Sequence, residues 1–306
     1  MPVVSVINYK GGVGKTTLVS NLAAELAWRG KHVLVMDMDP QASLTFSFVK
    51  PDEWSRDLSA SGTIMEWYES FESTAPVPLA SLVMTPKVVN SRLGTKGGKL
   101  DLIPSHLGLI NVDLELASEL GGGSMTQVKK KYLSVHGRLA RALAEPEFEH
   151  YDVVLIDCPP NFNIVTKTAI VASDQILIPA KADYLSTLGI DYLRRSLDEL
   201  VSNFNEWVDH GSAGDHHPIS PDILGVVFTM IAYYAKQPIQ AHRGFITAAK
   251  RLGVPVFDNY VRENKTLYAS APEFGAPVVL DGDTSARNIV HEVEELTTEF
   301  MKRARI

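Results

Sequence analysis

The chain has 306 residues and a formal net charge of −7, with 45% hydrophobic and 21% charged residues. This composition is typical of a globular protein and excludes a disordered or fibrous chain. The single cysteine, Cys158, excludes a disulfide framework and any site built from several thiolates of one chain. Because the whole chain is acidic, any contact with nucleic acid requires a local basic patch.

The N-terminal stretch MPVVSVINYK has no basic segment followed by an apolar one, as a secretory signal would have. No other stretch approaches the length of a membrane span. We therefore expect a cytoplasmic protein.

Short apolar runs alternate with helical patterns along the chain. Many of the runs are apolar at every position, which is typical of strands buried on both faces of a parallel sheet. Helical patterns include residues 16–30 and 183–204. The alternation predicts an α/β fold: a doubly wound, mostly parallel sheet with helices on both faces. The predicted strands are residues 3–8, 32–37, 100–104, 152–157, 175–180, 223–229 and 254–257.

We expect one domain over residues 1–306, because α/β folds of this length often form one continuous core. Three segments near residues 49–62, 88–99 and 209–221 are rich in Gly, Ser, Pro and Asp. Such composition favours exposed surface insertions within the domain over linkers between domains.

The stretch NYKGGVGKTT, residues 8–17, follows the first predicted strand and opens the first predicted helix. The usual phosphate-loop pattern, GxxxxGK[ST], fits residues 14–16 but meets Tyr9 where its first glycine belongs. The loop has instead a second lysine, Lys10, before two glycines. Glycine N–H groups and a helix N-terminus bind polyphosphate, so this context predicts a nucleotide site.

Each residue of this loop has a predicted role. Lys15 would reach the β and γ phosphates, Thr16 would hold Mg²⁺, and Thr17 would add a hydroxyl near the α phosphate. The predicted nucleotide contacts are Gly11, Gly12, Val13, Gly14, Lys15, Thr16 and Thr17.

Three aspartates follow predicted strands, at the sheet edge where open α/β sheets bind ligands. Asp157 ends the apolar run in LIDCPP, as expected of an acid that positions the water shell of a metal. Asp37 and Asp39 in MDMDPQ would point the same way if the strand extends that far. One aspartate after a strand more often caps a helix or a turn, but three beside a phosphate loop favour metal and water roles.

These motifs resemble the ParA/Soj/MinD group of deviant Walker A ATPases, and ParA/Soj partition proteins most closely. KGGVGKTT matches the deviant loop, MDMDPQAS the first switch and VVLIDCPPN the second. The likeness extends to LDLIPSHLGLINVDLEL, ASDQILIPAKADYLSTLGI, GVVFTM and VFDNYVRENKTLYASAPEFGAPVV. It covers nearly the whole chain apart from the three insertions.

The resemblance implies a homodimer in the ATP state that hydrolyses ATP to ADP and phosphate, slowly until a ParB-like adaptor binds. In the group, the extra lysine reaches across the dimer to the partner's ATP, which here would be Lys10. The implied catalytic residues are Lys10, Lys15 and Asp39, with Asp39 positioning the attacking water. The implied Mg²⁺ residues are Thr16, Asp37 and Asp157, and the implied adenine contacts are Thr229, Met230, Tyr260, Val261 and Arg262.

The group also implies nonspecific binding to double-stranded DNA in the ATP state, and hence a nucleoid-associated protein. In many Soj-like chains the strand that corresponds to GVVFTM leads to an Asp-x-Arg sequence whose arginine helps to bind DNA. This chain has Tyr234 near that arginine. For each of the other candidate cations taken separately, the alternative to a DNA contact is a position on a solvated helix face. These candidates are Arg194, Arg195, Lys236, Arg243, Lys250 and Arg251.

The expected function is partitioning of plasmid or chromosomal DNA, and three alternatives stay open. One is ATP-dependent positioning of a protein cargo. Another is a MinD-like regulator at the membrane, although residues 293–306 contain acidic as well as apolar residues, which favours a packed terminal helix over a membrane anchor. The third is an ATP-dependent synthetase or kinase on the same scaffold.

Overall fold

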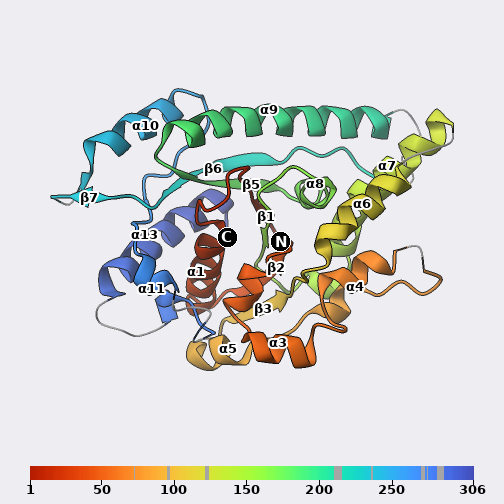
Figure 1. Cartoon of the computed structure of the whole chain (residues 1–306), viewed down its shortest axis with the longest axis horizontal. Helices are drawn as coiled ribbons and strands as arrows, with labels where there is room; N and C mark the ends of the chain where they lie inside the picture. The colour runs from red at the N-terminus through yellow and green to blue at the C-terminus, as the bar shows by residue number, and fades with distance from the viewer. Residues whose placement is uncertain are drawn as a thin grey trace.

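The structure is a computed structural model of the whole chain (Figure 1). The residues it describes are 1–71, 73–94, 97–120, 124–209, 216–235, 237–269, 273, 275–280 and 286–306.

A six-stranded sheet in which every pair of neighbours is parallel forms the centre of the molecule, in the order β3-β2-β4-β1-β5-β6. A separate antiparallel pair, β7 and β8, follows β6. The α/β fold with a parallel sheet is therefore confirmed. The strands are β1 (Val3–Val6), β2 (His32–Asp37), β3 (Lys99–Ile103), β4 (Val153–Asp157), β5 (Gln175–Lys181), β6 (Asp222–Thr229), β7 (Tyr233–Tyr234) and β8 (Gln237–Pro238).

The prediction of a seventh strand at residues 254–257 is wrong. This segment meets β6 at one isolated bridge, between Val256 and Val226. Pro255 lies inside the segment, and proline has no N–H to donate to a sheet ladder. The segment therefore runs beside the edge of the sheet without extending it.

Helices cover both faces of the sheet, and two of them, α1 and α9, contact the loop that leaves β1. Gly14 and Gly30 bound α1, and Gly30 closes it with a φ of 90° that suits glycine. Asp183 caps α9 by accepting from the N–H of Ser186 at 2.8 Å. The helices are α1 (Lys15–Trp28), α2 (Ser43–Phe46), α3 (Pro51–Asp57), α4 (Ile64–Glu69), α5 (Lys87–Leu93), α6 (Leu109–Glu119), α7 (Met125–Leu143), α8 (Ile164–Val171), α9 (Tyr184–Trp207), α10 (Gln240–Lys250), α11 (Lys265–Ala269) and α13 (Arg287–Ala304), with short 3₁₀ turns η1 (Leu79–Leu82), η2 (Pro146–Phe148) and η4 (Val278–Leu280).

Alternate strand residues face two cores. Val33 and Val35 of β2 pack with α1, α5 and α13, whereas Leu34 and Met36 pack with α6 to α10 on the other face. This alternation follows from the two-residue period of a strand, and it explains why the run is apolar throughout.

Two of the expected surface insertions contain helices that pack against the body. α3 buries Trp54, whose indole N–H donates to the carbonyl of Ser105 at 3.1 Å. α5 buries Val89 and Leu93. The expectation of exposed loops at 49–62 and 88–99 was therefore too simple, because a few apolar residues at helical spacing suffice to dock a short helix. Part of the third insertion, residues 210–215, lies outside the described residues.

The C-terminal helix α13 packs onto the body. Its apolar residues Val293, Leu296 and Phe300 are each at most 3% exposed, and α13 contacts α1. The face that a membrane anchor would need is thus covered by protein. Among the described helices, none is long and apolar enough to cross a membrane.

Candidate nucleotide site

The phosphate loop joins β1 to α1. Gly12 and Gly14 have φ angles of 67° and 77°, in the left-handed region that glycine adopts without strain. Among the described side chains, none caps the first turn of α1, and that turn contains no acidic residue. The free N–H groups and the positive end of the helix dipole are therefore available to an anion.

A cavity of about 530 Å³ lies over this loop. Of the predicted phosphate contacts, only Val13 does not line it: its side chain is buried, and its carbonyl accepts from the Thr229 hydroxyl at 2.6 Å. The predicted site residues that line this cavity are Gly11, Gly12, Gly14, Lys15, Thr16, Thr17, Asp39 and Met230.

Asp37 and Asp157 lie side by side at the ends of adjacent strands, since they are register partners of β2 and β4. Both are buried. Asp37 accepts two hydrogen bonds from the N–H and hydroxyl of Thr45, each 2.7 Å, and Asp157 accepts one from the hydroxyl of Thr16 at 2.7 Å. Burial raises the pKa of both carboxyls, and the charge of Asp37 raises that of Asp157 further.

Asp39 is oriented differently from Asp37. β2 ends at Asp37, so the condition under which the two carboxylates would point the same way is not met. Asp37 lies in the interior, where it accepts from the Asp39 N–H at 3.2 Å, whereas Asp39 lines the cavity. Asp39 thus has the exposure that a group orienting a water molecule requires.

The residues fit a Mg²⁺ ion whose remaining ligands would be phosphate oxygens and water. Oδ1 of Asp157 is buried and has no hydrogen-bond partner in the described part of the chain, and the Thr16 hydroxyl is adjacent. Within that same part, no three His, Cys, Asp or Glu side chains form a metal cluster of their own. Mg²⁺ commonly binds through few carboxylates plus substrate phosphates. The oxygens of Asp37 already accept from Thr45 and Asp39, so Asp37 would act through its charge.

Ser105 is a residue of this site that sequence reasoning missed. It is fully buried after β3; its hydroxyl donates to the carbonyl of Asp39 at 2.6 Å, and its N–H donates to Thr45 Oγ1 at 2.8 Å. Thr45 in turn donates to Asp37. One serine therefore connects the segments that hold both first-switch aspartates. The motif LDLIPSHLGL contains it, but nothing local in that motif identifies these partners.

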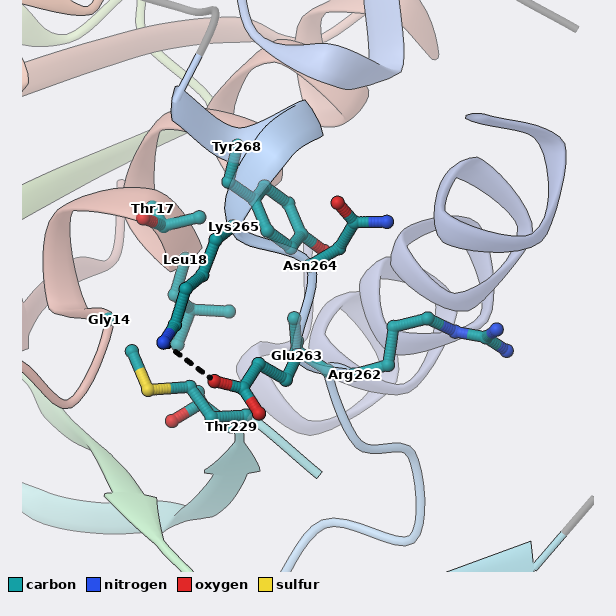
Figure 2. Close-up of a pocket in the computed structure, with 11 residues that line it drawn as sticks. Gly14, Thr17, Leu18, Thr229, Arg262, Glu263, Asn264, Lys265 and Tyr268 are labelled. Carbon is teal, nitrogen blue, oxygen red and sulfur yellow. Dashed lines mark ion pairs between the residues drawn. The ribbon is translucent and has the colours of Figure 1, made fainter. Parts of the chain in front are cut away.

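A second cavity, of about 110 Å³, adjoins the first and shares Gly14, Thr17, Met230 and Tyr268 with it. Figure 2 shows side chains from α1, the end of β6 and the segment around α11 converging on it. Among the implied adenine contacts, Thr229, Met230 and Val261 line it. The arrangement offers a narrow slot for a planar base beside the phosphate loop.

The remaining implied adenine contacts differ from expectation. Arg262 belongs to the cavity wall, but its guanidinium points away (Figure 2) and pairs with Glu292 of α13 at 2.5 Å. Tyr260 packs against Phe228, with ring centroids 6.3 Å apart, and is not one of the residues that line the slot. Four lining residues of the segment VRENKTLYAS were missed: Glu263, Asn264, Lys265 and Tyr268.

Lys10 does not line the phosphate cavity of its own chain. Its ammonium lies 2.7 Å from Oδ2 of Asp183, the cap of α9, and 3.4 Å from the hydroxyl of Ser186. About a third of each side chain of the Lys10–Asp183 pair is exposed, so solvent weakens it. The second lysine of the loop is thus held on α9, away from the site that Lys15 serves.

The candidate DNA-binding cations lie on two helices. On α9, Arg194 and Arg195 both pair with Asp191, at 3.2 and 2.7 Å. Arg243 and Lys250 lie on α10, with Arg251 at its end, and all three are exposed. Lys236 lies outside the described residues.

Comparison with known protein families shows to which family the chain belongs. The family AAA_31, described as an AAA domain, matches residues 1–209. The chain belongs to this AAA domain family. Two uncharacterised proteins of Mycobacterium tuberculosis are 27% identical over 259 residues, which are 85% of this chain and 66% of theirs. This chain therefore spans just under two thirds of the length of these relatives.

Other relatives of this chain are partition proteins. The chromosome partitioning protein ParA of Myxococcus xanthus is 28% identical over 91% of this chain and 81% of its own length. The sporulation initiation inhibitor protein Soj of Bacillus subtilis is 28% identical over 91% of this chain and 90% of its own. The resemblance to ParA/Soj partition proteins is therefore confirmed.

Solved structures share the fold. McdA of Cyanothece in complex with ATP has a TM-score of 0.69 at 22% identity, covering 100% of this chain and 97% of McdA. A plasmid partition protein of Borrelia burgdorferi has a TM-score of 0.62 at 20% identity, covering 99% of each chain. Cobyrinic acid a,c-diamide synthase of Mycobacterium smegmatis, with an ATP analogue and magnesium bound, has a TM-score of 0.60 at 24% identity over 90% of this chain and 93% of its own.

The Asp157→Asn substitution is expected to stabilise the nucleotide-free protein as the pH rises. Burial and the neighbouring Asp37 raise the pKa of Asp157 from 3.8 to about 8. The folded state therefore holds this proton to higher pH than the unfolded chain. Between pH 3.8 and about 8 the unfolded chain is ionised while the folded state is not, so the free energy of unfolding falls as the pH rises through this range. Asn removes this cost, so the melting temperature should exceed wild type by roughly 2–4 °C at pH 8, with little difference at pH 4.

The measurement is thermal unfolding with and without Mg²⁺ and ATP, with exposed Asp222→Asn as the control. Asp157→Asn should also lose the Mg²⁺-dependent part of the stabilisation by ATP. A gain of equal size at both pH values, or one that Asp222→Asn shares, would contradict the assigned cause.

Proposed function

We propose that this protein is an ATP-dependent dimerising ATPase that partitions plasmid or chromosomal DNA. In this proposal, ATP and Mg²⁺ bind between the phosphate loop and the switch aspartates, and the loaded dimer binds nonspecific double-stranded DNA of the nucleoid. A ParB-like adaptor then stimulates hydrolysis, and the subunits separate from each other and from DNA.

The observation that carries the proposal is the orientation of Lys10. The phosphate loop already has Lys15, which is buried at the base of the cavity, yet a second lysine of the same loop does not line that cavity. Two triphosphates brought face to face in a dimer need additional cations between them. Lys10 is suited to serve the nucleotide of a second subunit once it leaves Asp183.

Catalysis would then depend on four residues of this chain. Lys15 neutralises phosphate charge, Thr16 and Asp157 hold Mg²⁺, and Asp39 orients the attacking water from the cavity wall. Bound Mg²⁺ would offset the negative charge of the phosphates. Ser105 keeps the Asp39 segment in place through its 2.6 Å hydrogen bond.

A basic surface supports the DNA-binding part of the proposal. Residues 223–257 contain no Asp or Glu, although the chain as a whole is acidic. This segment includes α10 and the β7–β8 hairpin, which extends from the body at one end of the molecule (Figure 1). Tyr234 on the hairpin is 81% exposed. A segment with cations and no acids attracts a polyanion, whatever the net charge of the protein.

The same reasoning disfavours α9 as the DNA surface. Its two arginines share Asp191, and the helix also carries Asp198, Glu199 and Glu206. Four acids against two arginines give this helix a net negative charge. Lys250 also lies near an acid, Asp258, at 3.6 Å, but both of these side chains are at least half exposed and this is one pair against three cations. We therefore assign the DNA contacts to α10 and its end, with Arg243, Lys250 and Arg251.

Positioning of a protein cargo is the second candidate, because it would use the same ATP-dependent dimer and the same DNA track. A gene for a ParB-like protein beside centromere repeats would favour DNA as the cargo. Membrane association has less support, since the apolar residues of α13 are buried.

The Asp183→Asn substitution is expected to favour the ATP-dependent dimer. Asn preserves the cap of α9 but removes the charge that holds Lys10. The ATP concentration for half-maximal dimerisation should fall about two- to fivefold, as expected for a partly exposed ion pair. Sedimentation velocity across an ATP titration measures this change.

Lys10→Ala is the matched control, because it should retain nucleotide binding and lose the dimer. A dimer of Lys10→Ala that forms as in wild type would remove the proposed role in trans. An unchanged ATP requirement in Asp183→Asn would show that the ion pair does not oppose dimerisation.

Fluorescence anisotropy on a labelled random-sequence duplex tests DNA binding directly. We expect binding with ATP and none with ADP or without nucleotide, and Asp39→Ala should prolong the ATP state. Arg243→Ala should weaken binding and reduce the salt dependence, since each phosphate contact adds about one unit to the slope against salt. Arg195→Ala on α9 is the control and should bind like wild type. Absence of binding in a confirmed ATP dimer would contradict the DNA-based function.

A further inference from the structure

Two opposite charges lie in the narrow slot of about 110 Å³ beside the phosphate loop. Glu263 and Lys265 both line this slot, and Figure 2 shows their side chains reaching toward each other, with the ammonium 3.6 Å from the carboxylate. Neither residue lines the larger cavity over the phosphate loop. The pair therefore lies toward the end of the slot that is farther from the phosphates.

The walls of the slot contain apolar side chains that suit the faces of a planar ring. Leu18 and Val261 line it and are only 4% and 5% exposed, and Met230 lies where the slot adjoins the phosphate cavity. In a largely apolar site, a small number of polar groups fixes the orientation of the ligand. The polar groups of this slot therefore decide which base fits.

Three other polar side chains of the slot already have partners. The hydroxyl of Thr229 donates to a carbonyl of the phosphate loop at 2.6 Å, and Asn264 accepts a backbone N–H of the first turn of α11 at 3.0 Å. The guanidinium of Arg262 points away and pairs with a carboxylate of α13. Within the described chain, this leaves Glu263 as the acceptor and Lys265 as the donor that a base can engage at the far end of the slot.

The backbone of Glu263 is held in place, whereas its carboxylate can exchange partners. Its N–H donates to the carbonyl of Ile231 at 3.1 Å, and the preceding residue, Arg262, forms a parallel bridge with Ile231. The side chains of Glu263 and Lys265 are 48% and 89% exposed, and ion pairs this exposed are weak. A base can therefore replace the lysine at small cost while the acceptor keeps its position.

We propose that Glu263 selects adenine by accepting a hydrogen bond from its 6-amino group, which takes the place of Lys265. The ribose and the 6-substituent are attached to different rings of a purine. A base whose ribose faces the phosphate loop thus presents its 6-substituent to the far end of the slot. A carboxylate at that end favours an amino donor and repels the 6-oxygen of guanine. This inference rests on the proposed function, in which ATP is the nucleotide.

Lys265 is then the competitor of the base. Without nucleotide it offsets the charge of Glu263, and in the complex it returns to the solvent in which most of its side chain already lies. Removal of the lysine and removal of the acid should therefore affect base selection differently, although each abolishes the same ion pair. Lys265→Ala is for this reason the matched control for Glu263→Ala.

The test compares ADP with purine riboside diphosphate, which lacks the 6-amino group. Diphosphates exclude hydrolysis, and displacement of a fluorescent ADP analogue from the full chain with Mg²⁺ and without DNA measures both affinities. Wild type should bind ADP about tenfold more tightly, as expected for a hydrogen bond to a charged acceptor. Glu263→Ala should bind the two compounds equally, whereas Lys265→Ala should keep the preference for ADP.

A further variant gives a gain that misfolding cannot produce. Glu263→Gln offers a donor as well as an acceptor, so it should bind GDP about as well as ADP, whereas wild type should bind GDP more weakly.

A preference for ADP that survives in Glu263→Ala would show that another group reads the base, and it would overturn the inference. Equal binding of ADP and purine riboside diphosphate by wild type, or loss of the preference in both alanine variants, would do the same. Failure of wild type to bind any of these nucleotides would count against the proposed function. Nucleotide binding that is indifferent to Glu263 would count against this inference alone.

Discussion

Two buried carboxylates at the ends of adjacent strands impose the main constraint on this structure. Asp37 and Asp157 are register partners, and an ionised pair without compensation is costly in the interior. Their surroundings reduce that cost through hydrogen bonds from Thr45 and Thr16 and through the nearby Lys15. Because β1 neighbours β4, the strand order also brings the phosphate loop to this pair. The raised pKa of Asp157 means that this pair retains a proton near neutral pH when no cation is bound, and the proposed Mg²⁺ would favour the ionised form.

A second consequence of the strand order is that the segment around Asp39 is held by a residue far away in the sequence. Asp39 lies beyond the end of β2, and its carbonyl is held by Ser105, which follows β3. Since β3 neighbours β2, the two segments emerge from the same edge of the sheet. The indole of Trp54 donates to the carbonyl of the same serine, so α3 also supports the switch. A segment described from sequence as a surface insertion therefore contributes to the geometry of the site.

The sequence predicted those features that depend on local pattern. Continuous apolar runs located all six strands of the sheet, and glycine spacing located the phosphate loop, because both follow from neighbouring residues alone. Contacts between distant segments were not predictable in this way. Asp183 is 173 residues from Lys10, and nothing in ASDQILIPAKADYLSTLGI indicates that the cap of α9 would hold that lysine. The position of Tyr268 in the wall of the cavity of about 110 Å³ also depends on contacts between distant segments, so the sequence did not indicate it. Pro255 shows how one residue without an N–H can prevent an apolar run from joining a sheet.

The helix α9 is attached to the phosphate loop by two successive residues of opposite character. Tyr9 packs on its middle by aromatic contact, which salt and pH leave largely unchanged, while Lys10 pairs with its N-terminal cap through a partly exposed ion pair. The proposed function acts on the ion pair, because a triphosphate of a second subunit would compete with Asp183 for the lysine. Both residues precede Gly11 in one short loop, so release of the lysine would leave the aromatic contact of Tyr9 as the other of these two attachments. Under the proposed function, this loop is therefore the element that would connect nucleotide state to α9.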